Sequence, residues 1–172
     1  MALLEKQLFV KTSTIPGAGN GLFTKTFIPK GTRIVEYKGR KTVWKDVKDD
    51  DHNGYIYSIN RNHVIDALKT KSALARYAND ARGLTRVKGI TNNCEYVNEN
   101  YRAFIEATKD IPAGAEIFVS YGDDYWNVIR ENIRLDKQKQ KEEARKAAGG
   151  KKVNKAATKK TTKNKAGNKK KK

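Results

Sequence analysis

The chain has 172 residues with 37 Lys and Arg against 19 Asp and Glu, which gives a formal net charge of +18 at pH 7. No apolar run approaches the roughly 20 residues of a membrane-spanning helix, and no secretory signal opens the chain. A single cysteine, Cys94, excludes an internal disulfide framework, and with only two histidines it argues against a structural zinc site. The sequence therefore predicts an intracellular protein with no metal and no membrane association.

The positive charge is concentrated near the C-terminal end. Residues 137–172 hold 16 Lys and Arg against 2 acidic residues, a net charge of +14. From residue 149 the composition is dominated by Lys, Ala, Thr, Asn and Gly, which cannot bury enough apolar surface to offset the entropy lost on ordering. We therefore expect a disordered Lys-rich tail over 149–172, preceded by one domain with one core.

Short strands separated by turns dominate the residues before this tail. One helix is expected, from Tyr125 to about Ala148, because Trp126, Ile129 and Ile133 form an apolar stripe at helical spacing. Short strands, frequent turns and one terminal helix predict an α+β fold that is mostly β. In chain order, the expected strands are 8–10, 33–37, 55–59, 64–65, 101–107 and 116–121.

The first candidate for chemistry is the glycine-rich turn over residues 17–21. Glycines at 17, 19 and 21 allow positive φ angles and let a ligand approach the backbone closely. The turn does not open a helix with G-x-G-x-x-G and lacks the Gly-Lys-Ser/Thr of a P-loop, so phosphate binding is disfavoured. An ordinary turn between strands is the alternative.

Polar residues at the ends of expected strands are the second group of candidates. Tyr37, Tyr96 and Tyr121 each lie beside turn residues, and half-buried strand tyrosines with hydrogen-bonded hydroxyls are the alternative interpretation. Asn79 and Asp80 form a polar pair for which ordinary turn chemistry is the alternative.

Three segments, at 19–23, 76–79 and 116–122, follow one another in an informative order. Together they resemble the main motifs of the SET domain, the fold of protein-lysine methyltransferases. The resemblance extends over residues 6–130 and is nearest to the Set7/9-type and small viral SET enzymes. It implies several small sheets with a knot-like C-terminal threading. Beyond residue 130, the helix expected from the residue pattern continues as a charged extension over 131–148.

The resemblance also implies a cofactor and a reaction. A SET-domain enzyme transfers a methyl group from S-adenosyl-L-methionine to the ε-amine of a protein lysine, which enters through a narrow channel on the opposite face. The cofactor-binding residues that it implies are Ala18, Gly19, Asn20, Gly21, Asn79, Asp80, Tyr121 and Trp126. The implied catalytic residues are Tyr121, Tyr37 and Tyr96, and Gly54, Tyr55 and Val119 are expected to line the substrate channel.

This chain departs from the family pattern in three ways. Asp80 stands where the family usually has histidine, so its side chain can contact the cofactor only as an acceptor. Residues 82–91 are interpreted as an insertion. The family's zinc-binding cysteines after the domain are also missing, so the helix from Tyr125 is expected to close the site, with Trp126 on the adenine or, alternatively, in the core.

The Lys-rich tail predicts binding to nucleic acid through counterion release, and a solubilising or targeting tail is the alternative. With the SET resemblance, it favours a histone-like or other basic protein as substrate, the chain's own tail included. The expected location is the nucleus, the nucleoid or chromatin. A catalytically inactive SET scaffold that binds nucleic acid or chromatin is the alternative function.

Overall fold

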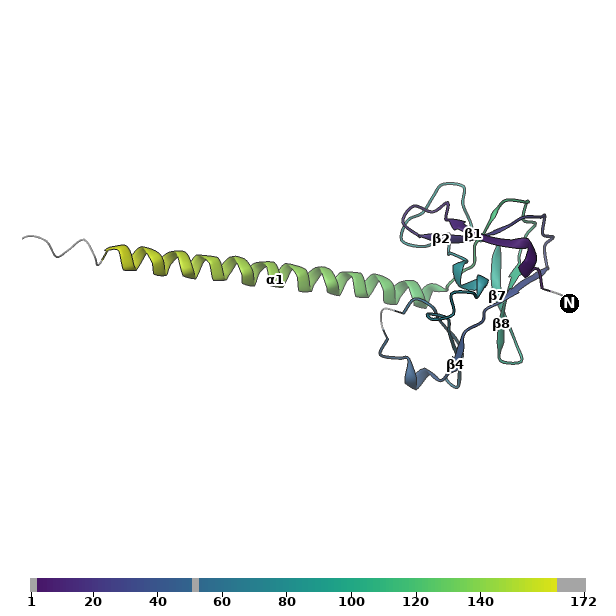
Figure 1. Cartoon of the computed structure of the whole chain (residues 1–172), viewed down its shortest axis with the longest axis horizontal. Coiled ribbons are helices and arrows are strands. Elements are labelled where there is room, and N and C mark those ends of the chain that lie inside the picture. The colour runs from purple at the N-terminus through teal and green to yellow at the C-terminus, as the bar shows by residue number, and fades with distance from the viewer. Residues whose placement is uncertain (1–2, 51–52, 164–172) are drawn as a thin grey trace, which may run out of the picture. The chain divides into compact units, whose positions relative to one another are not determined.

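The computed structural model describes residues 3–50 and 53–163, and side-chain surroundings as far as residue 147. Within these residues, nine short strands form three antiparallel sheets, and one long helix follows them (Figure 1). None of the described helices is long and apolar enough to cross a membrane. Contacts along the chain divide it into two units, Met1–Tyr121 and Gly122–Lys172, which we describe separately.

Each sheet has three strands, and each pairs segments that are distant in sequence. The first, in the order β1-β2-β9, holds β1 (Leu8–Thr12), β2 (Asn20–Thr24) and β9 (Glu116–Ile117). The second, in the order β3-β8-β7, holds β3 (Arg33–Glu36), β8 (Arg102–Ala107) and β7 (Cys94–Glu99). The third, in the order β4-β6-β5, holds β4 (Arg40–Thr42), β6 (His63–Asp66) and β5 (Ile56–Asn60). The mostly-β fold predicted from the sequence is confirmed.

Tight connections keep the strands short. Asn100 and Tyr101 have φ angles of 49° and 56°, so the β7–β8 hairpin turns through two residues in the left-handed region, as its strand twist requires. Three 3-10 turns lie outside the strands: the first precedes β1, and the other two lie in connections between strands. They are η1 (Glu5–Gln7), η2 (Trp44–Asp46) and η3 (Leu74–Tyr77).

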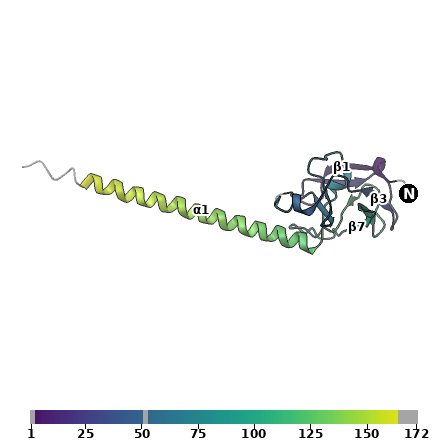
Figure 2. The same ribbon diagram turned by 90° about the horizontal axis from the view of Figure 1, so that it is seen from below.

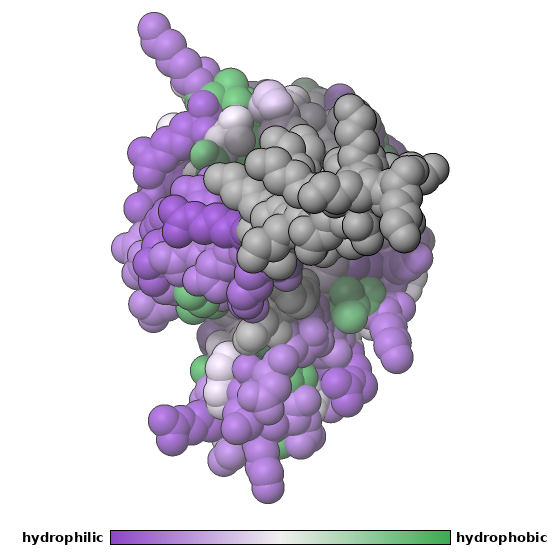
Figure 3. All heavy atoms as spheres, turned by 90° about the vertical axis from the view of Figure 1, so that its left-hand side faces the viewer, coloured by the Kyte–Doolittle hydropathy of each residue, from purple (hydrophilic) through white to green (hydrophobic). Residues whose placement is uncertain are grey.

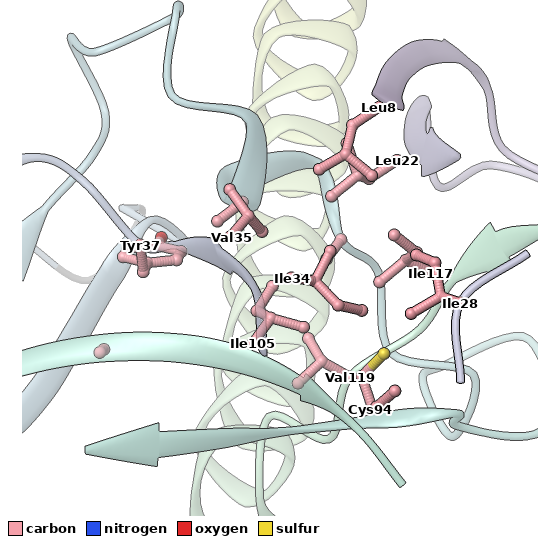
Figure 4. Close-up of a cluster of buried hydrophobic side chains, with 14 of the residues drawn as sticks. Leu8, Leu22, Ile28, Ile34, Val35, Tyr37, Cys94, Ile105, Ile117 and Val119 are labelled. Atoms are coloured by element: carbon pink, nitrogen blue, oxygen red, sulfur yellow. The ribbon is translucent and has the colours of Figure 1, made fainter. Parts of the chain in front are cut away.

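The hydrophobic core receives side chains from all three sheets (Figure 4). Leu22 on β2, Ile34 on β3, Ile65 on β6, Ile105 on β8 and Ile117 on β9 are all buried. Leucine and β-branched side chains fill such a core densely, so the three small sheets stabilise one another rather than folding alone.

The predicted last strand, 116–121, is too long, because β9 ends at Ile117. Beyond it, Phe118 forms a parallel bridge with Asn79, and Val119 forms one with Cys94. The Val119 N–H donates to the Asn79 carbonyl at 2.9 Å, and the Cys94 N–H donates to the Phe118 carbonyl at 2.9 Å. The chain at 118–119 therefore lies between the two ends of the loop 80–93, as the knot-like threading of the resemblance implies.

The second unit contains α1 (Asp123–Lys163), one uninterrupted helix (Figure 2). It begins two residues before the predicted start, with Asp123 and Asp124 in a first turn where negative charge favours the helix dipole. It also continues past residue 149, where the composition predicted disorder, because lysine and alanine have high helix propensity. Residues 164–172 of the predicted tail lie outside the described residues.

The visible surface is mostly polar. On the face drawn in Figure 3, hydrophilic side chains dominate, and hydrophobic ones form small separate spots. Such scattered exposure is ordinary for a protein surface and does not by itself mark an interface.

Candidate functional site

The glycines of the glycine-rich turn meet two different structural requirements, one of backbone conformation and one of space. Gly17 and Gly19 have φ angles of 80° and 72°, and a Cβ built at either would meet nothing within 4 Å. Their backbone is therefore both left-handed and open to a ligand. Gly21 does not have a positive φ, which corrects the sequence-based expectation; a Cβ there would lie 2.1 Å from a carboxylate oxygen of Glu116.

Glu116 is the centre of a partly buried hydrogen-bond network that sequence reasoning did not select as a site residue. Its carboxylate accepts from the Ser13 hydroxyl at 2.7 Å, the Thr14 backbone N–H at 2.7 Å and the Thr14 hydroxyl at 2.6 Å. The Asn79 amide donates to it at 3.2 Å. A charged residue opening the apolar run Ile117-Phe118-Val119 was the one signal available in the sequence.

Asn79 joins the three motifs that the resemblance rests on. Its side-chain amide donates to the Asn20 carbonyl at 3.0 Å as well as to Glu116. Its own carbonyl accepts the Val119 N–H at 2.9 Å. The glycine turn, the 76–79 segment and the last strand therefore meet at this residue, which no local pattern places there.

Asp80 is buried, and its carboxylate is bound to protein donors. One oxygen accepts the Arg82 backbone N–H at 2.7 Å and the Asn92 side-chain amide at 2.9 Å. The other accepts the Tyr121 backbone N–H at 2.9 Å. The Asp80 side chain, expected at the cofactor, thus connects both ends of the 82–91 loop to Tyr121, beyond the end of β9.

Two of the three predicted tyrosines lie in ring contact. The Tyr37 and Tyr96 centroids are 5.9 Å apart in an edge-to-face arrangement. Tyr57, which sequence reasoning missed, completes the cluster at 5.7 Å from Tyr37 and 4.5 Å from Tyr96. Tyr57 lies on the hairpin 55–66, and only the pairing of β5 with β6 reveals which face of that hairpin its ring occupies.

Burial controls the protonation of this cluster. It raises the pKa of the half-buried Tyr96 well above its usual value, and the nearby Tyr121 and Tyr37 hydroxyls raise that pKa further. Burial also raises the pKa of Tyr57, partly offset by the hydrogen bond to Asn98. The phenols of Tyr57 and Tyr96 therefore stay neutral at physiological pH.

The Tyr121 hydroxyl donates to the Ala78 carbonyl at 2.8 Å. The Tyr37 hydroxyl donates to the Tyr55 carbonyl at 3.0 Å. Because a hydroxyl has one proton, both oxygens are directed as acceptors toward any other polar group. Among the described residues, no protein group hydrogen-bonds to the Tyr96 hydroxyl.

The three residues expected to line the substrate channel lie in two settings, a turn before β5 and the hydrophobic core. Gly54 and Tyr55 form a turn just before β5, rather than part of that strand, and the Arg76 guanidinium lies 3.9 Å from the Tyr55 ring centroid. Val119 is fully buried in the hydrophobic core, and its place along the substrate channel stays a prediction (Figure 4).

Three further expectations concern single residues. Ala18 packs against the small cluster of Ile15 and Phe118, beside the glycine turn. Trp126 lies on α1 with its ring 5.1 Å from that of Tyr125, and its proposed contact with adenine stays a prediction. Cys94 is buried, and burial raises the pKa of its thiol to about 12, which is unsuited to a nucleophile.

The part of the chain that the structure describes offers no cluster of metal ligands. Within those residues, no group of three or more His, Cys, Asp and Glu side chains is placed to hold a metal ion.

Comparison with known proteins gives a consistent picture. A family model described as "SET domain" matches residues 19–122. Histone-lysine N-methyltransferase EZH2 of Chaetomium thermophilum is 29% identical over 146 residues, covering 77% of this chain and 9% of that protein. Histone-lysine N-methyltransferase set-17 of Caenorhabditis elegans is 29% identical over 133 residues, covering 76% of this chain and 46% of that protein. The chain thus spans less than half the length of either relative.

A solved structure extends the similarity to three dimensions. It is the humanized mutant of the Chaetomium thermophilum Polycomb Repressive Complex 2 bound to the inhibitor GSK126. The match has a TM-score of 0.57 at 26% identity and covers 75% of this chain and 16% of the matched chain.

Proposed function

This chain belongs to the SET-domain family, and from that premise we propose that it is an S-adenosylmethionine-dependent protein-lysine N-methyltransferase. The observation that carries the proposal is the meeting of the glycine turn, the 76–79 segment and the last strand at the Asn79 amide. Relatives named as histone-lysine N-methyltransferases support the reaction class.

The glycine turn fits the cofactor that the family implies. S-adenosylmethionine, when bound, supplies a methyl group made electrophilic by a positively charged sulfur. Its amino-acid end needs both acceptors and donors, which the open backbone at Gly17 and Gly19 offers at close range. We propose that Ala18, Gly19, Asn20, Gly21 and Asn79 hold this end. Asp80 is proposed to contribute through its backbone only, because its carboxylate is bound to Arg82, Asn92 and Tyr121.

The tyrosine cluster favours a neutral lysine amine. A lysine has an unperturbed pKa of about 10.4 and must lose a proton before it can act as a nucleophile. Tyr57 and Tyr96, whose pKa values are raised by burial, place neutral phenols beside Tyr37 and add no negative charge to the cluster. We propose that the lysine amine is desolvated beside these rings. Desolvation without a counterion lowers the pKa of an ammonium group, so release of the proton to water suffices and no strong base is needed.

Tyr121 is the residue that we propose to align the reaction. Its hydroxyl donates to the Ala78 carbonyl, which orients the oxygen as an acceptor toward positive charge. Held at this position, the oxygen stabilises positive charge at the reacting centre and restricts the geometry of approach. Tyr37 is fixed in the same way through the Tyr55 carbonyl.

The crowding of the channel bears on how many methyl groups are added. Three tyrosine rings lie within 5.9 Å of one another, and the Tyr96 hydroxyl has no hydrogen-bond partner among the described residues. We propose that this hydroxyl binds the lysine amine or a water molecule and restricts rotation of a methylated amine. The expected product is monomethyl-lysine.

The charge of the C-terminal residues suggests the partners. A net charge of +14 over residues 137–172 favours binding to nucleic acid whatever its sequence. We propose a nuclear or nucleoid location and a basic, DNA-associated substrate such as a histone, with the chain's own Lys-rich tail as a further candidate.

Labelled S-adenosylmethionine tests the proposal directly. The full chain is incubated with core histones, other DNA-binding proteins and itself, and modified lysines are mapped by mass spectrometry. Label on lysine ε-amines supports the proposed function. Absence of label in every protein, with the cofactor shown by calorimetry to bind, would overturn it.

A catalytically inactive SET scaffold is the second candidate, because the family's usual histidine is replaced by Asp80 and that carboxylate is bound to protein donors. Calorimetry separates the two functions. An inactive scaffold that binds only nucleic acid gives no heat with S-adenosylmethionine, whereas the proposed enzyme gives a saturable binding curve.

A further inference from the structure

The Asp80 carboxylate and the Ala78 carbonyl hold Tyr121 at two points. The Tyr121 backbone N–H donates to Asp80 at 2.9 Å, and its hydroxyl donates to Ala78 at 2.8 Å. Both acceptors belong to the same short segment, so the backbone and the far end of the side chain are fixed against one rigid element. Movement of this segment would displace the Tyr121 oxygen.

Asp80 also fixes the segment itself. Its other oxygen accepts from the Arg82 N–H at 2.7 Å and from the Asn92 amide at 2.9 Å. Asn92 in turn accepts the Ala81 N–H at 2.8 Å. The two ends of the loop that carries the insertion 82–91 are therefore closed on Asp80, which is only 5% exposed.

The chemistry of these contacts requires a carboxylate. Three donors from Arg82, Asn92 and Tyr121 converge on two oxygens, and an ionised carboxylate offers only acceptors. An asparagine at this position would direct an N–H₂ group at one of the same donors. A neutral imidazole has one acceptor nitrogen and could serve only one of the three contacts.

We propose that Asp80 is a positioning residue for Tyr121 in methyl transfer, an inference that rests on the proposed function. The carboxylate replaces the usual histidine and couples the inserted loop to the placement of the Tyr121 hydroxyl. It acts through Tyr121 and does not contact the transferring group. The role depends on which groups donate and which accept in these hydrogen bonds. Two variants can exchange donor and acceptor between positions 80 and 92.

Asp80→Asn in the full chain is the first variant. The introduced N–H₂ group faces one of the N–H donors that Asp80 accepts, so a hydrogen bond is lost. Tyr121 is then no longer held in its position. We expect kcat to fall by about tenfold or more, with KM for cofactor and substrate changed by about twofold at most. Asp110→Asn is the control, because Asp110 also accepts a backbone N–H, from Lys30, but is exposed and lies outside the three motifs.

The double variant Asp80→Asn/Asn92→Asp restores the polarity. The amide introduced at position 80 donates to the new carboxylate at position 92 and accepts from the Tyr121 N–H, while position 92 still accepts the Ala81 N–H. Among the contacts described above, the Arg82 N–H loses its acceptor, and Arg82 is exposed to water. We expect the double variant to recover most of the lost kcat. Such recovery would not occur if Asp80 only filled space or stabilised the fold.

The outcomes separate the inference from the proposed function. Wild-type kcat in Asp80→Asn, or a folded double variant no better than the single one, overturns the role of Asp80. If Asp80→Asn fails to fold, the double variant decides alone: activity supports the inference, and a folded, inactive protein overturns it. If the wild type transfers no methyl group, the proposed function fails first. Amide hydrogen exchange at Tyr121 then still tests the contact, since exchange at the rate of an exposed amide contradicts it.

Discussion

The unit Met1–Tyr121, here called the β-rich unit, differs from helix α1 in how its charged side chains are bound. In the β-rich unit, the Glu116 and Asp80 carboxylates are each bound by donors from distant parts of the chain. On α1, an ion pair joins Glu131 to Arg134, which are neighbours three residues apart and open to solvent. The first arrangement fixes atoms in position, and the second contributes charge without fixing a partner.

The difference between the two regions fits the two proposed roles. The β-rich unit would carry out methyl transfer, and the C-terminal residues would attract nucleic acid without sequence specificity. Positions of reacting groups matter to within a fraction of an ångström in catalysis, and the Asp80 and Glu116 carboxylates of the β-rich unit are buried and bound by several donors. Counterion release depends on the number of cations and little on their geometry, so exposed lysines suffice near the C-terminal end. Variants in the two regions should therefore fail in different assays.

The largest effect that we expect is on nucleic-acid binding. Deletion of residues 149–172 removes 11 lysines, and the slope of log K against log salt for duplex DNA should flatten by several units. The melting temperature should stay nearly unchanged, because the deleted residues contribute no apolar side chain larger than valine. An unchanged salt slope in a filter-binding or fluorescence titration would show that the tail does not contact phosphates.

Gly21→Ala should produce the next largest effect, on the free energy of unfolding. The new Cβ would lie 2.1 Å from Glu116, so the network around that carboxylate must shift, at a cost of about 1–3 kcal/mol. Gly114→Ala is the control, because a Cβ there meets nothing within 4 Å and adds only the strain of a positive φ, about 1–2 kcal/mol. Rescue of Gly21→Ala by Glu116→Ala, measured by denaturant unfolding, would isolate the clash. Lack of any coupling between the two sites would contradict it.

Tyr96→Phe should change the product more than the rate. Loss of one hydrogen bond of about 1–2 kcal/mol should shift the product from monomethyl- toward dimethyl-lysine. Tyr57→Phe is the matched control, because the Tyr57 hydroxyl already donates to Asn98 at 3.1 Å and should not contact the amine. Mass spectrometry at long reaction times measures the ratio. Predominant trimethyl-lysine from the wild type would show that the channel is wider than these rings suggest.

The smallest effect concerns alkaline pH. Burial raises the pKa of the Cys94 thiol from an ordinary value of 9.0 to about 12, so the unfolded chain releases this proton before the folded chain does. The resulting stability is complete below pH 9 and is lost as pH rises toward 12. By pH 10 this group should have reduced the free energy of unfolding by about 1 kcal/mol.

Cys94→Ala provides the control for this pH dependence. Its free energy of unfolding should fall less between pH 8 and pH 10 than that of the wild type. The buried tyrosines Tyr57 and Tyr96 titrate in the same direction in both proteins, so they cancel in the comparison. Equal pH dependence in the two proteins would contradict the assigned pKa.

Local patterns predicted the features of this fold that depend on neighbours in sequence. Strand alternation and turn residues predicted the hairpin of β5 and β6, and the confirmed mostly-β architecture followed from many such segments. The end of the last strand was predicted wrongly, because Phe118 and Val119 pair in parallel with Asn79 and Cys94, which are far away in sequence.

The hydrogen-bond network was beyond sequence reasoning for the same physical reason. Ser13 and Glu116 are 103 positions apart, and no period or spacing connects a hydroxyl to a carboxylate over that distance. Gly21 was selected for backbone freedom, whereas its absent Cβ makes room for Glu116. Asp80 was recognised as a departure from the family pattern, but only the folded chain reveals which three donors it accepts.

One comparison tests the central claim, that the β-rich unit aligns a lysine amine for methyl transfer through Tyr121. Wild-type protein and Tyr121→Phe are given the same labelled S-adenosylmethionine and the same substrate protein, and methyl-lysine formation is followed by mass spectrometry. We predict an unchanged fold and cofactor affinity in Tyr121→Phe, with transfer reduced by about 10²-fold or more. Equal rates in the two proteins would contradict the account, because the residue held between Asp80 and Ala78 would then have no part in the reaction.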